Sequence, residues 1–116
     1  MNDSSFWNKL ETILLNAELV IDRRKGSTHP KYPAFIYPFD YGYIKNTSAG
    51  DGNEIDVWRG SLKEISLDGI ICTVDILKRD TEIKLLVGCT DDEQNSIVEF
   101  INRSEFMSAF LVKRNL

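Results

Sequence analysis

Two apolar runs on either side of a short polar turn constrain the fold of this chain more than any other feature. Residues 69–77 and 83–89 are rich in Ile, Val and Leu, and the residues between them, 78–82, are all charged or polar. Apolar, β-branched runs of this length that end at turn residues are typical of strands. We therefore predict that the two segments pair as a hairpin.

Shorter apolar runs and two helical patterns complete the predicted elements. From Ser4 or Ser5 to Ala17, apolar residues recur at spacings of three and four, which predicts an amphipathic helix. Thr90 and two acids open a second predicted helix that ends near Arg103. The further predicted strands lie at residues 19–21, 35–37, 41–44, 54–59 and 107–113. A mainly β domain with flanking helices follows, but spacing alone does not distinguish a small closed or nearly closed barrel from an α+β sheet.

Composition limits the classes of protein to consider. With 116 residues and 42% hydrophobic content, the chain is predicted to form a single domain over residues 1–116. No apolar run approaches the roughly 20 residues of a membrane helix, and no basic region precedes an apolar stretch at the N-terminus. We expect a soluble, cytoplasmic protein without a membrane partner. Cys72 and Cys89 lie in apolar β-like segments, so buried reduced thiols are expected.

The charge balance bears on the partners of the chain. The formal net charge is −4, which argues against nucleic acid as a partner because such binding depends on Lys and Arg neutralising phosphates. An acidic protein that binds an anion needs metal ions or a local basic cluster. The sequence offers candidates for both.

A tyrosine-rich segment followed by a Gly-rich turn carries the strongest chemical signal. Residues 37–44 read YPFDYGYI, and residues 50–57 read GDGNEIDV, which places Asp51 and Asp56 five residues apart between a turn and a strand. Hard divalent cations such as Mg²⁺ bind carboxylate oxygens, with water and substrate phosphate at the remaining positions. A lone Asp-Gly pair is more often only a turn, so the preceding tyrosines decide the interpretation.

These segments resemble a known family. Together with IDRRKGSTHPKYP at residues 21–33, which we predict as a long ordered loop, they resemble the signature region of the family I soluble inorganic pyrophosphatases, in particular the short single-domain type. The resemblance is dense from Leu19 to Val57 and weaker from Asp75 to Val87. It implies an OB-like β-barrel with helices packed outside, and the Mg²⁺-dependent hydrolysis of diphosphate to two phosphates by metal-activated water.

The resemblance also implies roles for individual residues. The implied metal ligands are four acids: Asp51, Asp56, Asp80 and Glu82. The implied diphosphate ligands are Lys31, Tyr43 and Lys84, and the implied catalytic set is Asp56, Tyr43, Lys31 and Asp22, with Asp22 helping to organise metal-bound water. We also expect one of Arg23, Arg24 and Lys25 to contact phosphate. Tyr37 and Tyr41 are interpreted as core or wall residues whose hydroxyls need a partner.

One departure from the family pattern keeps a second function open. Asn53 stands where the family has an acid that is proposed to accept a proton from the attacking water, and an amide cannot act as a general base at pH 7. The alternative is therefore a catalytically weak or inactive pyrophosphatase-like protein that binds metal and phosphate compounds. An OB-type nucleic-acid binder is disfavoured by the acidic balance. A homo-oligomer is possible, with Phe6, Trp7 and Trp58 as interface or, more commonly, core aromatics.

Overall fold

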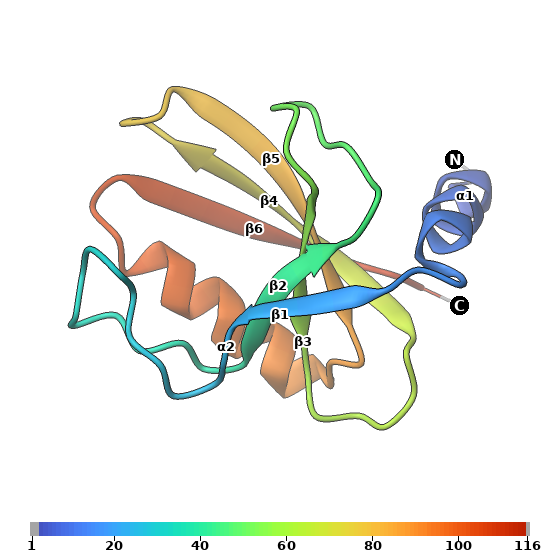
Figure 1. The fold of residues 1–116 in the computed structure, drawn as a ribbon, viewed down its shortest axis with the longest axis horizontal. Coiled ribbons are helices and arrows are strands. Elements are labelled where there is room, and N and C mark those ends of the chain that lie inside the picture. The colour runs from blue at the N-terminus through green and yellow to red at the C-terminus, as the bar shows by residue number, and fades with distance from the viewer. Residues whose placement is uncertain (1–2, 116) are drawn as a thin grey trace.

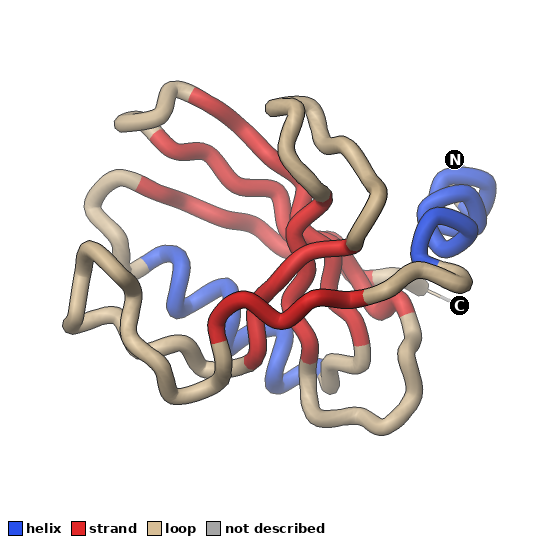
Figure 2. Tube along the Cα trace, in the orientation of Figure 1, coloured by secondary structure: helices blue, strands red, loops and turns tan. Residues whose placement is uncertain are grey.

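The computed structural model describes residues 3–115, which form two helices and a six-stranded sheet (Figures 1 and 2). The elements in chain order are α1 (Ser4–Leu14), β1 (Leu19–Arg23), β2 (Asp40–Ile44), β3 (Ile55–Arg59), β4 (Leu67–Asp75), β5 (Asp80–Val87), α2 (Asp91–Asn102) and β6 (Met107–Lys113). The strand order is β1-β2-β3-β5-β4-β6. Neighbouring strands are antiparallel except for β3 and β5, which are parallel.

The predicted mainly β fold with flanking helices is confirmed, and the sheet is open. Its order begins at β1 and ends at β6, so the barrel-like description holds only loosely. The free edge of β6 is partly covered, because the Asn102 side chain accepts a hydrogen bond from the Ala109 N–H at 2.7 Å and donates one to the Ala109 carbonyl at 3.1 Å. An uncovered edge strand is a template for pairing with another chain, and Asn102 interrupts that template near its middle.

The hairpin predicted from the two apolar runs is confirmed, but its turn lies earlier in the chain. β4 and β5 pair from Leu67↔Val87 to Asp75↔Asp80. The Asp75 carboxylate accepts the backbone N–H groups of Leu77 and Lys78 at 2.9 and 3.1 Å, which closes a turn over residues 76–79. Asp80 and Glu82 therefore lie on strand β5 and not in the turn, where side-chain alternation fixes their directions.

One predicted strand and the predicted end of the first helix are wrong. Residues 35–37 do not form a strand; only Ile36 makes an isolated bridge, with Thr28. The backbone of this segment bonds instead to the loop before it, with the Tyr37 N–H donating to the Ser27 carbonyl at 2.9 Å. The first helix ends at Leu14 and not at Ala17, because Leu15 is extended and Asn16 has a left-handed φ of 60°.

The two helices pack against opposite faces of the sheet, because their buried residues belong to two separate core clusters. On the α1 face the buried residues are Trp7, Leu14, Ile44, Val57, Leu67, Ile70, Leu85 and Val87. On the α2 face they include Trp58, Ile71, Leu86, Ile97, Phe100 and Ile101. Trp7 and Trp58 are thus core residues, whereas Phe6 is 47% exposed. Thr90 and Glu93 form the predicted cap of α2, each side chain accepting the other's backbone N–H.

The remaining composition-based expectations concern membranes and thiols. No helix within residues 3–115 is long and apolar enough to cross a membrane. Both cysteines are free thiols. Burial, followed by the nearby acids Glu93 and Asp68, raises the pKa of the Cys89 thiol to about 12, so Cys89 stays protonated and acts as a small apolar residue. Cys72 is only half-buried.

Gly42 is the residue that allows the tyrosine strand to pair with β1. A Cβ built at Gly42 would lie 1.8 Å from the carbonyl oxygen of Val20 on β1. We expect Gly42→Ala to destabilise the protein by at least about 3 kcal/mol, since backbone atoms cannot move aside as a side chain can. Urea denaturation followed by circular dichroism measures this change.

The matched control is Gly50→Ala, because a Cβ at Gly50 would meet no atom within 4 Å. Its denaturation midpoint is expected to stay close to that of the unchanged protein. Equal midpoints for the two variants would contradict the packing argument.

Candidate active site

Neighbouring strands bring the predicted site residues to one face of the sheet. Tyr43 on β2 lies directly opposite Asp56 on β3, and Tyr41 lies opposite Trp58. Since side chains alternate along a strand, Tyr41 and Tyr43 share a face with Asp56. β5 runs parallel to β3 on its other side and adds Lys84 to the same face. This is the face that α2 covers further along.

A buried lysine is the centre of the site. The Lys84 ammonium donates to the Tyr41 hydroxyl at 2.8 Å, to Asp56 Oδ2 at 2.8 Å and to Glu82 Oε2 at 3.1 Å. These three bonds use all three N–H donors of an ammonium group. Lys84 is only 6% exposed. Burial by itself lowers the pKa of the ammonium, but Tyr41 and Asp56 outweigh burial and raise it, so Lys84 carries its charge at neutral pH.

Tyr41, and not Tyr43, contributes its hydroxyl to this network. The Tyr41 hydroxyl donates to Asp56 Oδ2 at 2.7 Å, and burial raises the pKa of Tyr41, so the hydroxyl remains a donor. Within residues 3–115 the Tyr43 hydroxyl makes no hydrogen bond. The two tyrosines share a face and differ only in which residue of β3 lies opposite, so the sequence pattern cannot separate them. A substrate role for Tyr43 stays a prediction.

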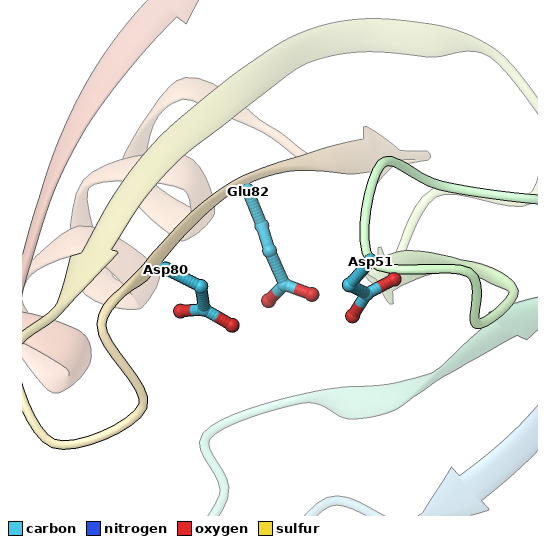
Figure 3. A group of neighbouring side chains, drawn as sticks. All are labelled: Asp51, Asp80 and Glu82. Atoms are coloured by element: carbon cyan, nitrogen blue, oxygen red, sulfur yellow. The ribbon is translucent and has the colours of Figure 1, made fainter.

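Three carboxylates gather beside the lysine network. One ligand oxygen each from Asp51, Asp80 and Glu82 lie within 4.8 Å of one another. Figure 3 shows Glu82 between the other two, with all three carboxylates directed into the space between β5 and the loop that carries Asp51. Hydrogen bonding from the neighbouring Glu82 carboxyl lowers the pKa of the Asp51 carboxyl, whereas burial raises the pKa of Glu82.

This oxygen donor set fits Mg²⁺. Carboxylates packed this closely repel one another unless a proton or a cation lies between them. A hard divalent cation binds carboxylate oxygens together with water and phosphate oxygens. The cluster is also open on one side, because Asp51 is exposed. Room remains there for water and phosphate oxygens, which Mg²⁺ usually retains among its ligands.

Asn53 holds Asp51 in its orientation. The Asn53 backbone N–H donates to Asp51 Oδ1 at 3.0 Å, and the Asn53 side-chain amide lies 3.4 Å from Asp51 Oδ2 as a donor. Gly52 between them has a φ of 87°, which favours glycine. Asn53 is therefore a hydrogen-bond donor to a candidate metal ligand.

Asp56 is set apart from the other predicted metal ligands. Asp56 is not a member of the three-carboxylate cluster and pairs with Lys84 at 2.8 Å, and Glu82 connects the two groups because it belongs to the cluster and also pairs with Lys84. Glu82 and Lys84 share a strand face, as predicted from their spacing, but the pair is largely buried and not an ordinary surface ion pair.

The predicted residues Asp22 and Lys31 make no contact with the Lys84 network within residues 3–115. Asp22 is exposed on β1 at a bulge, and Lys31 is exposed in the loop that follows. Within residues 3–115 neither side chain makes an ion pair or hydrogen bond. Arg23 donates to the Tyr37 hydroxyl, and the Tyr37 ring lies 5.8 Å from that of Tyr41, so Arg23 is the member of the 23–25 run that connects to the site.

A basic cluster accompanies this loop. His29 stacks on Tyr37 with ring centroids 6.3 Å apart and planes 11° apart. Burial lowers the pKa of His29, and the charges of Arg23, Lys31 and Lys78 lower it further. Three positive side chains therefore act on the same imidazole, and Lys78, from the β4–β5 turn, is a member of this basic cluster that sequence reasoning did not single out.

The comparisons with known proteins agree with this geometry. The sequence profile of the family described as inorganic pyrophosphatase matches residues 9–102. A search of curated proteins gives no match. The fold is similar to that of inorganic pyrophosphatases from Coxiella burnetii (14% identity, TM-score 0.63, covering 82% of this chain and 84% of that one) and Helicobacter pylori (16% identity, TM-score 0.60, covering 82% and 81%). A third, from Neisseria gonorrhoeae, has 17% identity and a TM-score of 0.60 over 83% and 81%.

At these identities the structural likeness establishes the fold, and the profile match establishes the family. The chain belongs to the inorganic pyrophosphatase family, whose members are diphosphate-hydrolysing enzymes.

The contrast between the two tyrosines can be tested by stability. Tyr41→Phe removes a hydroxyl that accepts from Lys84 and donates to Asp56. We expect it to lower the free energy of unfolding by about 1–3 kcal/mol, because both charged partners lose a hydrogen bond. Tyr43→Phe, the matched control on the same strand face, is expected to change it by less than about 0.5 kcal/mol. Chemical denaturation of both variants measures the difference, and a larger loss for Tyr43→Phe would refute this assignment.

Proposed function

We propose that this protein hydrolyses inorganic diphosphate to two phosphates in a Mg²⁺-dependent reaction with water. The observation that carries the proposal is that a cluster of three carboxylates shares one member, Glu82, with a buried ammonium, that of Lys84. A cation site and an anion-binding group are thus in direct contact. A substrate that is a polyanion complexed with a divalent cation matches this pair of sites.

The residues of the chain would act in two ways: some would bind the cation, and others would hold positive charge and polar groups in place. Asp51, Asp80 and Glu82 would hold the cation, and we keep Asp56, which is paired with Lys84, as a further candidate ligand. When bound, Mg²⁺ supplies positive charge that activates water and neutralises phosphate oxygens. The Lys84 ammonium and the Tyr41 hydroxyl both donate to Asp56 Oδ2, which holds the ammonium charge in a fixed position beside the cation ligands. A fixed positive charge of this kind favours a transition state in which phosphate oxygens gain charge.

The loop residues complete the proposed substrate site. Lys31 and Arg23 belong to the basic cluster around His29, and a phosphate group at this end of the site would be neutralised by their charges. We also keep Tyr43 and Asp22 as candidate residues, Tyr43 to contact a substrate oxygen and Asp22 to organise water. Catalysis of this kind depends on positioning and charge neutralisation, so no covalent protein nucleophile is required.

The first test is phosphate release from diphosphate. With Mg²⁺ we expect release that a chelator abolishes, and we expect Asp56→Asn to remove it, since Asp56 orients both Lys84 and Tyr41. Asp92→Asn removes the same charge from an exposed position on α2 and should leave the rate unchanged. No release by the unchanged protein at any Mg²⁺ concentration would refute the proposal.

A second candidate function rests on Asn53. Because Asn53 cannot accept a proton and is instead a donor to Asp51, a protein that binds Mg²⁺ and diphosphate with little or no turnover is the alternative. Calorimetry that detects Mg²⁺-dependent diphosphate binding, together with no phosphate release, would favour it over hydrolysis.

Two substitutions at residue 53 separate a missing base from a positioning role. We expect Asn53→Asp to raise kcat, up to the roughly 10²- to 10⁴-fold that general-base assistance contributes. Asn53→Ala removes the side-chain donor to Asp51 without adding a base, and it should weaken Mg²⁺ binding without raising kcat. A kcat that is unchanged in Asn53→Asp would show that a base at this position is not what limits the rate.

A further inference from the structure

The backbone of Lys31 is held by the ring of His29. The Lys31 N–H donates to His29 Nδ1 at 3.0 Å, whereas the Lys31 side chain is exposed and makes no hydrogen bond or ion pair within residues 3–115. Pro30, which lies between the two residues, has no N–H, so Lys31 provides the first backbone donor after His29. A bond from a side chain to the N–H two residues further on is the one that Asn and Asp form in turns. The position of Lys31 therefore depends on the His29 ring.

The His29 ring is itself fixed against the core. It stacks on Tyr37 with ring centroids 6.3 Å apart and planes 11° apart, and its centroid lies 5.0 Å from that of Tyr32. Tyr37 is 4% exposed and belongs to the core on the α2 face. The His29 backbone N–H donates to the Phe35 carbonyl at 2.9 Å, which joins the two ends of this part of the loop. An anchored imidazole thus determines where the chain continues into Lys31.

The bond to Lys31 exists only while His29 is neutral. An acceptor nitrogen needs a free lone pair, and both ring nitrogens of an imidazolium are donors. The titratable side chains that face the ring come from β1, the loop and the β4–β5 turn, and they are Arg23, Lys31, Tyr32, Tyr37 and Lys78. Burial, followed by the positive charges among them, lowers the pKa of His29 below its ordinary value. The imidazole is therefore neutral, and its bond to Lys31 intact, at neutral pH.

We infer that His29 is a positioning residue for Lys31 and that one proton switches it: the neutral imidazole holds the Lys31 backbone in place, and the imidazolium releases it. The inference rests on the proposed function, in which Lys31 is a diphosphate ligand, and deepens it by making that ligand pH-dependent. A histidine whose pKa is lower in the folded than in the unfolded chain contributes its bond fully above the ordinary pKa of about 6.5. The bond is lost as the pH falls through the lower value of the folded protein, so acid releases Lys31.

A simpler explanation is that His29 only packs against two tyrosine rings and has no effect on Lys31. Two substitutions separate packing from the hydrogen bond. His29→Asn loses the ring stacking, but its side-chain oxygen can accept the N–H two residues further on and does not titrate. His29→Phe keeps an aromatic ring against Tyr37 and has no acceptor. The hydrogen bond predicts that the Asn variant is the milder change at Lys31, whereas packing predicts the Phe variant.

The test is the exchange rate of the Lys31 backbone amide hydrogen, measured by NMR without metal or diphosphate and divided by the rate of an unstructured chain at the same pH. At neutral pH we expect His29→Phe to exchange about five- to tenfold faster than the unchanged protein, which corresponds to the loss of one hydrogen bond. His29→Asn should stay within about twofold of the unchanged protein. Circular dichroism checks that both variants fold.

The pH dependence is the decisive measurement, and it needs no substitution in the protein. Between about pH 8 and about pH 5, the Lys31 amide of the unchanged protein should lose about five- to tenfold in protection, with the midpoint at which the His29 ring resonances titrate. The protection in His29→Asn should stay constant. A constant protection in the unchanged protein while the His29 ring titrates would overturn the inference, and so would an equal loss in His29→Asn.

Turnover gives an independent check of the link to the substrate. The KM for diphosphate with Mg²⁺ is divided by that of His29→Asn at the same pH, which removes the titration of diphosphate itself. We expect this ratio to rise about five- to tenfold as His29 is protonated, with little change in kcat, and to stay constant when both proteins carry Lys31→Met. A constant ratio without Lys31→Met would overturn the link. The exchange measurement needs no turnover, so failure of the proposed function and failure of this inference are distinguishable.

Discussion

The pairing of the Lys84 ammonium with Asp56, Glu82 and Tyr41 is the interaction on which the site and the middle of the sheet both depend. A buried charge is tolerated only when it is paired and hydrogen-bonded, and removing one partner is strongly destabilising. Here the partners come from β2, β3 and β5. The network therefore stabilises one register of these three strands, including the parallel contact of β3 with β5. The residues of the candidate site thus also help to specify the fold that holds them.

Strand β5 shows how one segment serves both purposes. Its first half alternates between half-buried and exposed positions, and its second half is buried throughout. Asp80 and Glu82 occupy one face of the first half, Lys84 follows on the same face at the start of the buried half, and Leu85, Leu86 and Val87 are fully buried between the two helices. The apolar half fixes the strand in the core, which holds the charged half rigidly at the edge of that core. A site built on a strand in this way is more precisely positioned than one built on loops.

Much of the fold follows from sequence periodicity, and the failures have identifiable causes. The β4–β5 hairpin, the helix from Asp91 to Asn102 and the last strand are local patterns, so alternation and capping predict them. The order of the strands, with β5 between β3 and β4, depends on contacts between distant segments and is not encoded in any one pattern. The shift of the hairpin turn depends on two backbone hydrogen bonds to Asp75. Strand register places Tyr43 directly opposite Asp56, yet the Tyr41 hydroxyl reaches Asp56 and Lys84, so the choice between the tyrosines depends on side-chain packing. Spacing predicted that Glu82 and Lys84 share a face, but only the packing shows that the pair is buried.

The long loop between β1 and β2 is the part of the candidate site whose arrangement could be predicted least from the sequence. Its candidate ligand Lys31 is exposed, and the arrangement of Arg23 and His29 around Tyr37 joins residues from both ends of the loop. The acidic half of the site is held by strands and by the short turn at Asp51, whereas the basic half is held largely by this loop and by aromatic stacking. A cation bound by Asp51, Asp80 and Glu82 would need little rearrangement, since these oxygens are already together. A phosphate group bound on the basic side would depend on side chains of the loop, so the cost of ordering side chains on binding would fall mainly on that side of the proposed site.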